Sequence, residues 1–179
     1  TILDGQTYLP GSTGNALHFD GLDDRVSIPL TASVSRTNNF SYEMWVNMDT
    51  INTYDQLIQE EMAAGGCQIY SSNTGYPDFT MYISGAWVSA TSSVALVAGN
   101  WTHIVATFSS VAGMVIYING VSRGTNANVT PLQNTINSIN LGATATSANP
   151  FDGLMDEVRI YNKTLSLAEV QANYASGAG

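Results

Sequence analysis

The 179-residue chain has few charged residues, one cysteine and no long apolar run. Only five residues are Lys or Arg, against fourteen Asp or Glu, so the formal net charge is −9. Partners such as nucleic acid or an anionic membrane need a basic surface, and the acidic balance argues against both. Cys67 has no second cysteine to pair with and is expected to be a small buried apolar residue. No apolar run is long enough to span a bilayer, so we expect no membrane insertion.

Charged residues make up only 11% of the chain, so Ser, Thr, Asn and Gly must supply much of the polar surface. A surface of hydroxyls and amides suits an extracellular or cell-surface protein, and its acidity is compatible with Ca²⁺. The length suits one domain with a sizeable core. Because the chain begins at Thr1, we expect residues 1–179 to be one monomeric domain of a longer secreted or surface protein.

Short alternating segments separated by Gly and Asn turns predict an all-β fold. Ser84-Gly85 and Asn119-Gly120 are hairpin turn signals, and residues 1–14 are expected to be an irregular leading segment. The spacing predicts an antiparallel two-sheet β-sandwich or a barrel. We expect strands at residues 16–20, 26–28, 40–46, 56–59, 68–71, 78–83, 86–90, 101–108, 114–118, 121–124, 138–141 and 153–162.

One short helix is predicted near the C-terminus. Ser166 and Glu169 have the spacing of a capping box, which predicts that the helix begins there. Leu167, Val170 and Tyr174 would share its apolar face, and Gly177 would end it.

The strand at residues 153–162 places a carboxylate among apolar side chains. Asp156 has the same parity as Leu154, Val158 and Ile160, so it is expected on the apolar face. Desolvating a lone carboxylate costs several kcal/mol or more, so Asp156 needs a partner. The sequence leaves three kinds of partner open: an arginine, backbone N–H groups or a metal ion such as Ca²⁺.

Four segments together resemble the laminin G-like, concanavalin A-like jelly rolls. Residues 16–26 (ALHFDGLDDRV) are similar to the opening motif of that family, and residues 40–46 (FSYEMWV) to its second motif. WTHIV at 101–105 followed by YING at 117–120 resembles the central hairpin, and residues 153–162 (GLMDEVRIYN) resemble the closing motif.

This resemblance implies two curved antiparallel sheets packed as a jelly roll, with one structural Ca²⁺ site where the opening and closing motifs meet. Carried over by motif, Asp20 and Asp156 would supply carboxylate oxygens. The turn at Gly21–Asp24 would supply backbone carbonyls or another carboxylate, with Asp23 favoured. Hard oxygen ligands from separate segments are what Ca²⁺ prefers. The alternative is a metal-free fold in which backbone N–H groups hold Asp20 and Asp156.

The sequence argues against an enzyme, although relatives on this fold include glycoside hydrolases. Hydrolysis of a glycosidic bond needs two carboxyl groups at a set separation, and the hydrolase relatives carry them as Glu-x-Asp-x-x-Glu on one strand. No such run occurs here. Glu60-Glu61 is expected to lie in a solvated loop, and His18 and His103 are expected to be packed or surface residues rather than bases.

A binding role is therefore expected, with a glycan or polysaccharide as ligand. Aromatic side chains that could stack on sugar rings are concentrated between residues 54 and 90: Tyr54, Tyr70, Tyr76, Tyr82 and Trp87. Core packing is the commoner fate of strand aromatics and is expected for Trp45 and Trp101, whereas exposure and burial of Trp87 are both open. A protein-binding adhesion module and a structural spacer stay open as alternatives.

Overall fold

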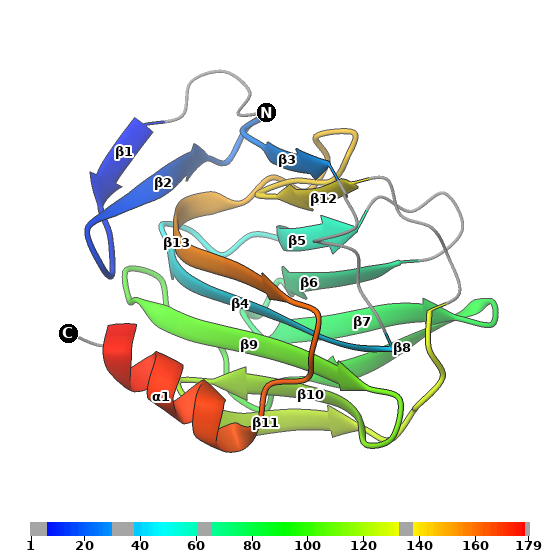
Figure 1. The fold of residues 1–179 in the computed structure, drawn as a ribbon. Coiled ribbons are helices and arrows are strands. Elements are labelled where there is room, and N and C mark those ends of the chain that lie inside the picture. Colours follow the sequence, from blue (N-terminus) through cyan, green and yellow to red (C-terminus); the bar gives the residue numbers. More distant parts are fainter. Residues whose placement is uncertain (1–6, 30–37, 61–65, 133–137, 178–179) are drawn as a thin grey trace.

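The computed structural model describes residues 7–29, 38–60, 66–132 and 138–177, which form two antiparallel sheets packed face to face and one helix (Figure 1). The strands are β1 (Thr7–Pro10), β2 (Asn15–Asp20), β3 (Val26–Pro29), β4 (Asn39–Met48), β5 (Asp55–Glu60), β6 (Cys67–Ser71), β7 (Pro77–Ile83), β8 (Ala86–Thr91), β9 (Thr102–Ser109), β10 (Gly113–Ile118), β11 (Val121–Asn126), β12 (Ser138–Leu141) and β13 (Asp152–Tyr161). The helix, α1, is Leu167–Gly177.

The strand order confirms the predicted two-sheet sandwich. One sheet has the order β1-β2-β13-β4-β9-β10-β11 and the other has the order β3-β12-β5-β6-β7-β8. Strand β13, near the C-terminus, lies between β2 and β4, so Asp152 pairs with Asp20 and Met155 pairs with Val46. The opening and closing segments of the chain are therefore neighbours in the seven-stranded sheet.

Alternation of side chains builds the core between the sheets. On β4, Phe40, Tyr42, Met44 and Val46 point inward, as the sequence predicts, and each is at most 1% exposed. Phe79 on β7 meets Phe40 edge to face across the core, with ring centroids 6.3 Å apart. Burial of each large apolar side chain contributes about 1.5–3 kcal/mol, so this layer stabilises the sandwich.

The two predicted hairpin turns are confirmed. Ser84 and Gly85 have φ angles of 51° and 86°, and Asn119 and Gly120 have φ angles of 51° and 76°. Positive φ at both central residues is what a two-residue hairpin of the favoured twist requires. The sequence prediction missed β1: residues 7–10, expected to be irregular, pair with residues 15–18 as an edge strand.

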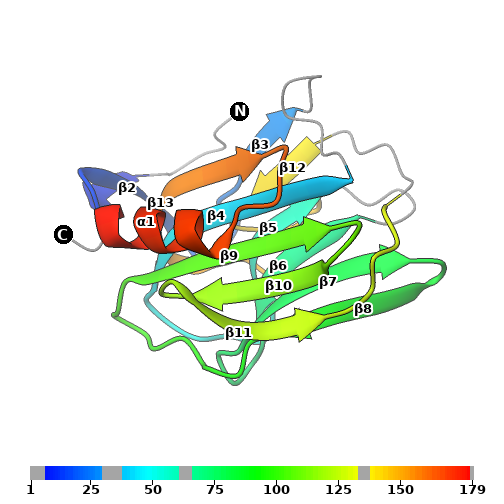
Figure 2. The ribbon, with the colours of Figure 1, turned by 60° about the horizontal axis from the view of Figure 1, so that its bottom comes forward.

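Helix α1 lies on the outer face of the seven-stranded sheet, away from the sandwich core (Figures 1 and 2). The capping box is present, since Ser166 N–H donates to Glu169 Oε2 at 2.8 Å. Val170 is fully buried and Tyr174 stacks on Trp45, but Leu167 is 49% exposed, so its predicted place on the packed face is wrong. In the described part of the chain, no helix is long and apolar enough to cross a membrane.

Candidate functional site

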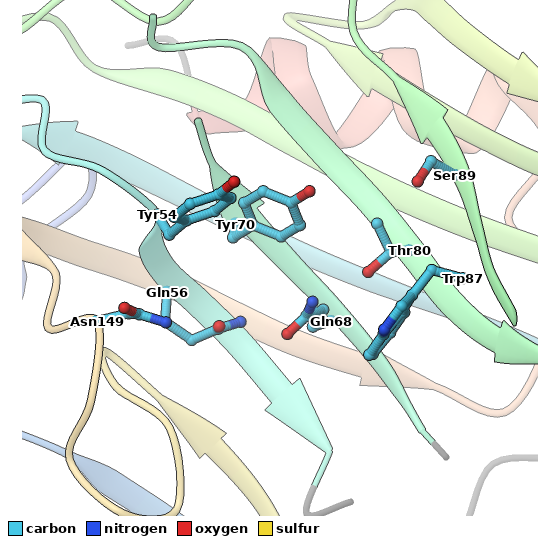
Figure 3. A pocket seen from close by; sticks show the side chains of 8 residues that line it. All are labelled: Tyr54, Gln56, Gln68, Tyr70, Thr80, Trp87, Ser89 and Asn149. Atoms are coloured by element: carbon cyan, nitrogen blue, oxygen red, sulfur yellow. The ribbon is translucent and has the colours of Figure 1, made fainter. Parts of the chain in front are cut away.

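An open cleft lies on the outer face of the six-stranded sheet (Figure 3). Its volume is about 380 Å³, and its lining residues are Tyr54, Gln56, Gln68, Tyr70, Thr80, Trp87, Ser89 and Asn149. These residues come from β5 to β8, from the segment before β5 and from the loop before β13. The cleft therefore draws on most of the stretch that the sequence singles out for its aromatic residues.

Strand parity explains why polar side chains face this cleft. Phe79 and Met81 of β7 point into the core, so Thr80 between them points outward. A bulge on β5 between Gln56 and Ile58 lets both Leu57 and Ile58 enter the core while Gln56 faces out. Register pairing then aligns outward polar residues across all six strands: Ser27, Asn140, Gln59, Gln68, Thr80 and Ser89.

Two groups of aromatic side chains stand at opposite sides of the cleft (Figure 3). Tyr54 is 52% exposed, and its ring lies 5.5 Å from that of Tyr70, centroid to centroid. Across the cleft Trp87 is 45% exposed, which settles the question left open by the sequence. Tyr82 supports Trp87 from the side, with ring centroids 5.2 Å apart and an interplanar angle of 63°. Each exposed ring is thus held in place by a second aromatic ring.

The residue that presents the first of these rings has an unusual backbone conformation. Tyr54 has a φ of 64°, in the left-handed region that non-glycine residues rarely adopt. Such conformations cost on the order of 1–3 kcal/mol and tend to occur at functional sites. The chain after it is anchored, because Gln56 N–H donates to the Asn149 carbonyl at 3.0 Å.

Amides and hydroxyls form the floor between the aromatic groups. Gln56 Nε2 donates to the carbonyls of Ile58 and Ile69, at 2.8 and 3.2 Å, which leaves its carbonyl oxygen with hydrogen-bonding capacity. Thr80 Oγ1 is buried and has no hydrogen-bond partner in the described part of the chain. An unpaired buried hydroxyl is costly, and this one lies beneath the floor of the cleft.

The predicted ligand-binding residues separate into two sets. Tyr54, Tyr70 and Trp87 line the cleft, and Tyr82 packs against Trp87. Tyr76 is 39% exposed but lies outside the cleft lining. The sequence interpretation missed the amide and hydroxyl residues of the floor. Their outward parity on β6 to β8 was the sequence signal that could have identified them.

The two tryptophans expected in the core differ. Trp45 is 4% exposed but lies under α1, where its ring contacts those of His103 and Tyr174, rather than between the sheets. Trp101 is only half-buried, so the core prediction is wrong for this residue. Trp101 precedes β9 instead of forming part of it. It lines a second, more apolar pocket of about 420 Å³ together with Val94, Val97 and Ile118.

Three carboxylates of the β2–β3 turn form an acidic cluster. One ligand atom from each of Asp20, Asp23 and Asp24 lies within 4.8 Å of the others. Asp24 is 3% exposed; its Oδ2 accepts from Asp20 N–H at 3.0 Å, and its Oδ1 has no hydrogen-bond partner in the described ranges. Burial raises the pKa of Asp24, the Asp20 N–H hydrogen bond opposes this shift, and the neighbouring Asp20 and Asp23 carboxylates add to it. A divalent cation would satisfy the unpaired oxygen and remove the repulsion.

Asp156 does not join this cluster. Met155 packs in the core, so Asp156 faces outward next to Trp45, and the predicted apolar parity is wrong. The reason is a bulge after Asp156, where Glu157 has a φ of 50°; beyond it Val158 returns to the core face. Backbone N–H groups of Thr13 and Glu157 donate to the Asp156 carboxylate at 2.9 and 2.8 Å. For Asp156 this is the metal-free arrangement that the sequence left open.

Two glutamates are buried elsewhere in the sandwich. Glu43 accepts from His103 Nε2 at 2.8 Å and from Tyr161 O–H at 2.5 Å, beneath α1. Glu60, expected in a solvated loop, is fully buried: it accepts from Tyr42 O–H at 2.6 Å and from Cys67 N–H at 2.9 Å. The hydrogen bonds from these two donors explain why Glu60 is buried and not solvated. Glu61 lies outside the described residues. Cys67 is buried, as expected.

These features define the class of protein: a jelly-roll sandwich with an open polar and aromatic cleft on one sheet. The chain belongs to the concanavalin A-like lectin/glucanases superfamily, because a laminin G family model with that description matches residues 19–171. The family resemblance seen in the sequence is therefore confirmed. No curated protein matches the chain.

Solved structures of the same fold include three informative relatives. Domain 4 of AbnA, an extracellular arabinanase from Geobacillus stearothermophilus, was solved with arabinotriose; it is 24% identical, with a TM-score of 0.79, and the match covers 95% of this chain and 81% of that one. The binding domain of Paraclostridial Mosquitocidal Protein 1 has a TM-score of 0.82 at 18% identity, with coverages of 98% and 47%. The ligand-binding domain of botulinum neurotoxin serotype D, solved with N-acetylneuraminic acid, has a TM-score of 0.75 at 16% identity, with coverages of 98% and 45%. The chain thus spans about half the length of the toxin domains, and at these identities the likeness shows the fold alone.

Proposed function

We propose that this domain is a non-catalytic carbohydrate-binding module of an extracellular or cell-surface protein, and that the cleft on the six-stranded sheet is its binding site. The observation that carries the proposal is the combination of exposed Tyr54 and Trp87 with amide and hydroxyl side chains in one cleft. Sugar rings have apolar faces that stack on aromatic side chains and hydroxyls that exchange hydrogen bonds with amides and hydroxyls.

The ligands named for the relatives support a glycan as the ligand class. Arabinotriose is present in the arabinanase domain and N-acetylneuraminic acid in the serotype D toxin domain. Both are carbohydrates, although one is neutral and the other acidic. We infer from them the class of ligand and not a particular sugar.

The proposal of a non-catalytic module rests on the chemistry of the cleft lining. Its eight residues carry neither a carboxyl group nor an imidazole. Glycoside hydrolysis uses a pair of carboxyl groups that flank the scissile bond. The buried Glu43 and Glu60 are fully enclosed, so a polysaccharide would not reach them.

We also propose a structural Ca²⁺ site at the β2–β3 turn, held by Asp20, Asp23 and Asp24. Relative to the sequence prediction, Asp24 replaces Asp156 in the ligand set. Three carboxylates within reach of one ion, one of them buried with a free oxygen, fit the hard-oxygen preference of Ca²⁺. The cluster residues do not line the cleft, so the ion would stabilise the fold and would not touch the ligand.

A glycan array followed by calorimetry tests the binding proposal. We expect Trp87→Ala and Tyr54→Ala each to weaken binding about tenfold or more, because each removes a stacking surface. Tyr8→Ala is the matched control, since Tyr8 is a 63% exposed tyrosine on edge strand β1 of the other sheet. Chelator should leave the affinity of the folded protein unchanged.

Two outcomes would contradict the proposal. An array without any bound glycan would favour a protein-binding adhesion module or a spacer. Unchanged affinity of Trp87→Ala, combined with a large loss of thermal stability, would show that Trp87 serves the fold instead of the ligand.

A further inference from the structure

The cleft lining is electrically neutral. All eight residues around it are tyrosine, tryptophan, glutamine, asparagine, serine or threonine. Proteins that recognise carboxylate or sulfate groups on a ligand usually present Arg or Lys to them, often in paired hydrogen bonds. In the described part of the chain no Arg or Lys lines the cleft. Arg25, on the same sheet side, donates instead to the carbonyl oxygens of Thr144 and Ala145.

One charged group that adjoins this lining is the carboxylate of Asp78. Asp78 on β7 lies opposite Tyr70 of β6 and Thr91 of β8, and it shares the outward face with Thr80 two residues later. Tyr70 O–H donates to Asp78 Oδ2 at 2.9 Å, and Thr91 Oγ1 donates to Oδ1 at 3.0 Å. Asp78 thus places negative charge at the hydroxyl end of Tyr70, an aromatic residue of the cleft.

The ionisation of Tyr70 is consistent with this arrangement. Burial raises the pKa of the Tyr70 phenol, and the negative charge and hydrogen bond of Asp78 raise it further. Tyr70 therefore remains a neutral hydrogen-bond donor to Asp78 at physiological pH. No positive charge from the described lining residues offsets the carboxylate.

The aromatic groups also set the length of the ligand. By strand register, Tyr70 and Trp87 are separated by four residues along the strands and by two strand spacings. This amounts to about 13 Å along the strands and about 10 Å across them. A single sugar ring cannot contact both aromatic groups, whereas an oligosaccharide can lie over the polar floor between them.

We propose that the cleft takes a neutral oligosaccharide in preference to one that carries carboxylate groups, and that Asp78 is the residue that enforces this discrimination. The proposal rests on the proposed glycan-binding function and adds its ligand class. Asp78 acts through its charge and by positioning Tyr70, without stacking on the sugar itself.

The test uses a matched pair of probes: a linear oligogalacturonate and the same oligomer after chemical reduction of its carboxyl groups. A panel of neutral oligoarabinosides, oligoxylosides and oligoglucosides of two to six residues is measured beside them by calorimetry. We expect a neutral probe of three or more residues to bind and the acidic oligomer to bind about tenfold more weakly than its reduced form at low salt. Added salt should reduce this difference, because it screens charge repulsion.

Asp78→Asn is the decisive variant. The asparagine side chain keeps a carbonyl oxygen that can accept from Tyr70, but it removes the charge. We expect the discrimination between acidic and neutral oligomers to shrink about tenfold and to lose its salt dependence. Asp49→Asn is the control, because it changes the net charge equally at a residue that follows β4 of the other sheet and pairs with His18, whereas Asp78 accepts a hydrogen bond from Tyr70 of the lining.

The possible failures are distinguishable. Equal or tighter binding of the acidic oligomer by the wild type would overturn the neutral-ligand inference and leave glycan binding standing. Discrimination that is the same in Asp78→Asn and the wild type would overturn the role of Asp78. Absence of binding to every probe would overturn the proposed function, and the inference with it.

Discussion

The buried carboxylate of Glu43 allows a stability prediction that does not depend on any ligand. Glu43 is fully buried on the outer face of the seven-stranded sheet, beneath α1. It accepts hydrogen bonds from His103 Nε2 at 2.8 Å, Tyr161 O–H at 2.5 Å and Asn173 Nδ2 at 2.9 Å. Arg159 adds an ion-pair contact at 3.6 Å. One carboxylate therefore connects β13 and α1 to the centre of the sheet.

Glu43→Ala would remove the common acceptor of this network and leave Nε2 of the fully buried His103 without its partner. Removing one partner of a buried charged pair costs about 3–5 kcal/mol. For a domain of this size each kcal/mol corresponds to about 2–4 °C, so the melting temperature should fall by about 6–20 °C. Glu157→Ala is the control, because the ion pair of Glu157 with Arg159 is partly exposed and should be worth about 1 kcal/mol or less.

The pH dependence gives a second measurement on the same residue. Burial alone would raise the pKa of Glu43, but the hydrogen bonds from His103 and Tyr161 and the charges of His103 and Arg159 hold it below its ordinary value of 4.5. The stability that ionised Glu43 contributes is therefore present above pH 4.5 and is lost as the pH falls through the lowered pKa. Thermal melts should lose this acid-dependent step in Glu43→Gln. A Glu43→Ala melting temperature within about 2 °C of the wild type would refute the reasoning.

Two further predictions concern the metal cluster and a glycine. Ca²⁺ at about 100 times its dissociation constant should stabilise the domain by about 2.7 kcal/mol. Asp24→Asn should abolish this stabilisation by Ca²⁺ while raising the melting temperature in chelator. Asp156→Ala should leave the stabilisation by Ca²⁺ intact. A wild-type melting temperature that is indifferent to Ca²⁺ and to chelator would rule out the site. Gly153→Ala should cost about 2 kcal/mol or more in urea unfolding, because φ is 143° and the new Cβ would overlap the Asn47 carbonyl. Gly99→Ala, where nothing lies within 4 Å, should cost less, and equal losses would contradict the steric argument.

The sequence predicted the fold well because its signals are local. The inward parity of Phe40 to Val46 and the positive-φ turn at Asn119-Gly120 follow from short-range rules that tertiary contacts did not override. The missed strand β1 has only four residues and pairs at an edge, so little in its own sequence distinguishes it from a loop. Edge pairing of this kind depends on a neighbour that the local pattern does not specify.

The candidate metal site shows where parity reasoning fails. A strand pattern assumes uninterrupted alternation, and one extra residue after Asp156 reverses the face of everything that follows. Val158 and Ile160 are therefore apolar and inward while Asp156 is outward. Asp24 lies within the turn that the sequence indicated, although Asp23 was favoured there. The turn after Asp20, in which Leu22 N–H donates to Asp20 Oδ1, directs Asp24 back towards the end of the strand.

The two outer faces of the sandwich explain why the cleft is the surface to test. On the seven-stranded sheet, α1 covers Trp45, His103 and Glu43, and Tyr174 of the helix stacks on the tryptophan at 5.7 Å. On the six-stranded sheet, no helix of the described chain covers the outward row of amides and hydroxyls (Figure 2). A protein partner that covered this face would need polar groups matched to the amides and hydroxyls of the floor and apolar surface matched to Tyr54 and Trp87. A flat, hydroxyl-rich and uncharged ligand meets both requirements, since its ring faces can stack on Tyr54 and Trp87 while its hydroxyls reach the floor.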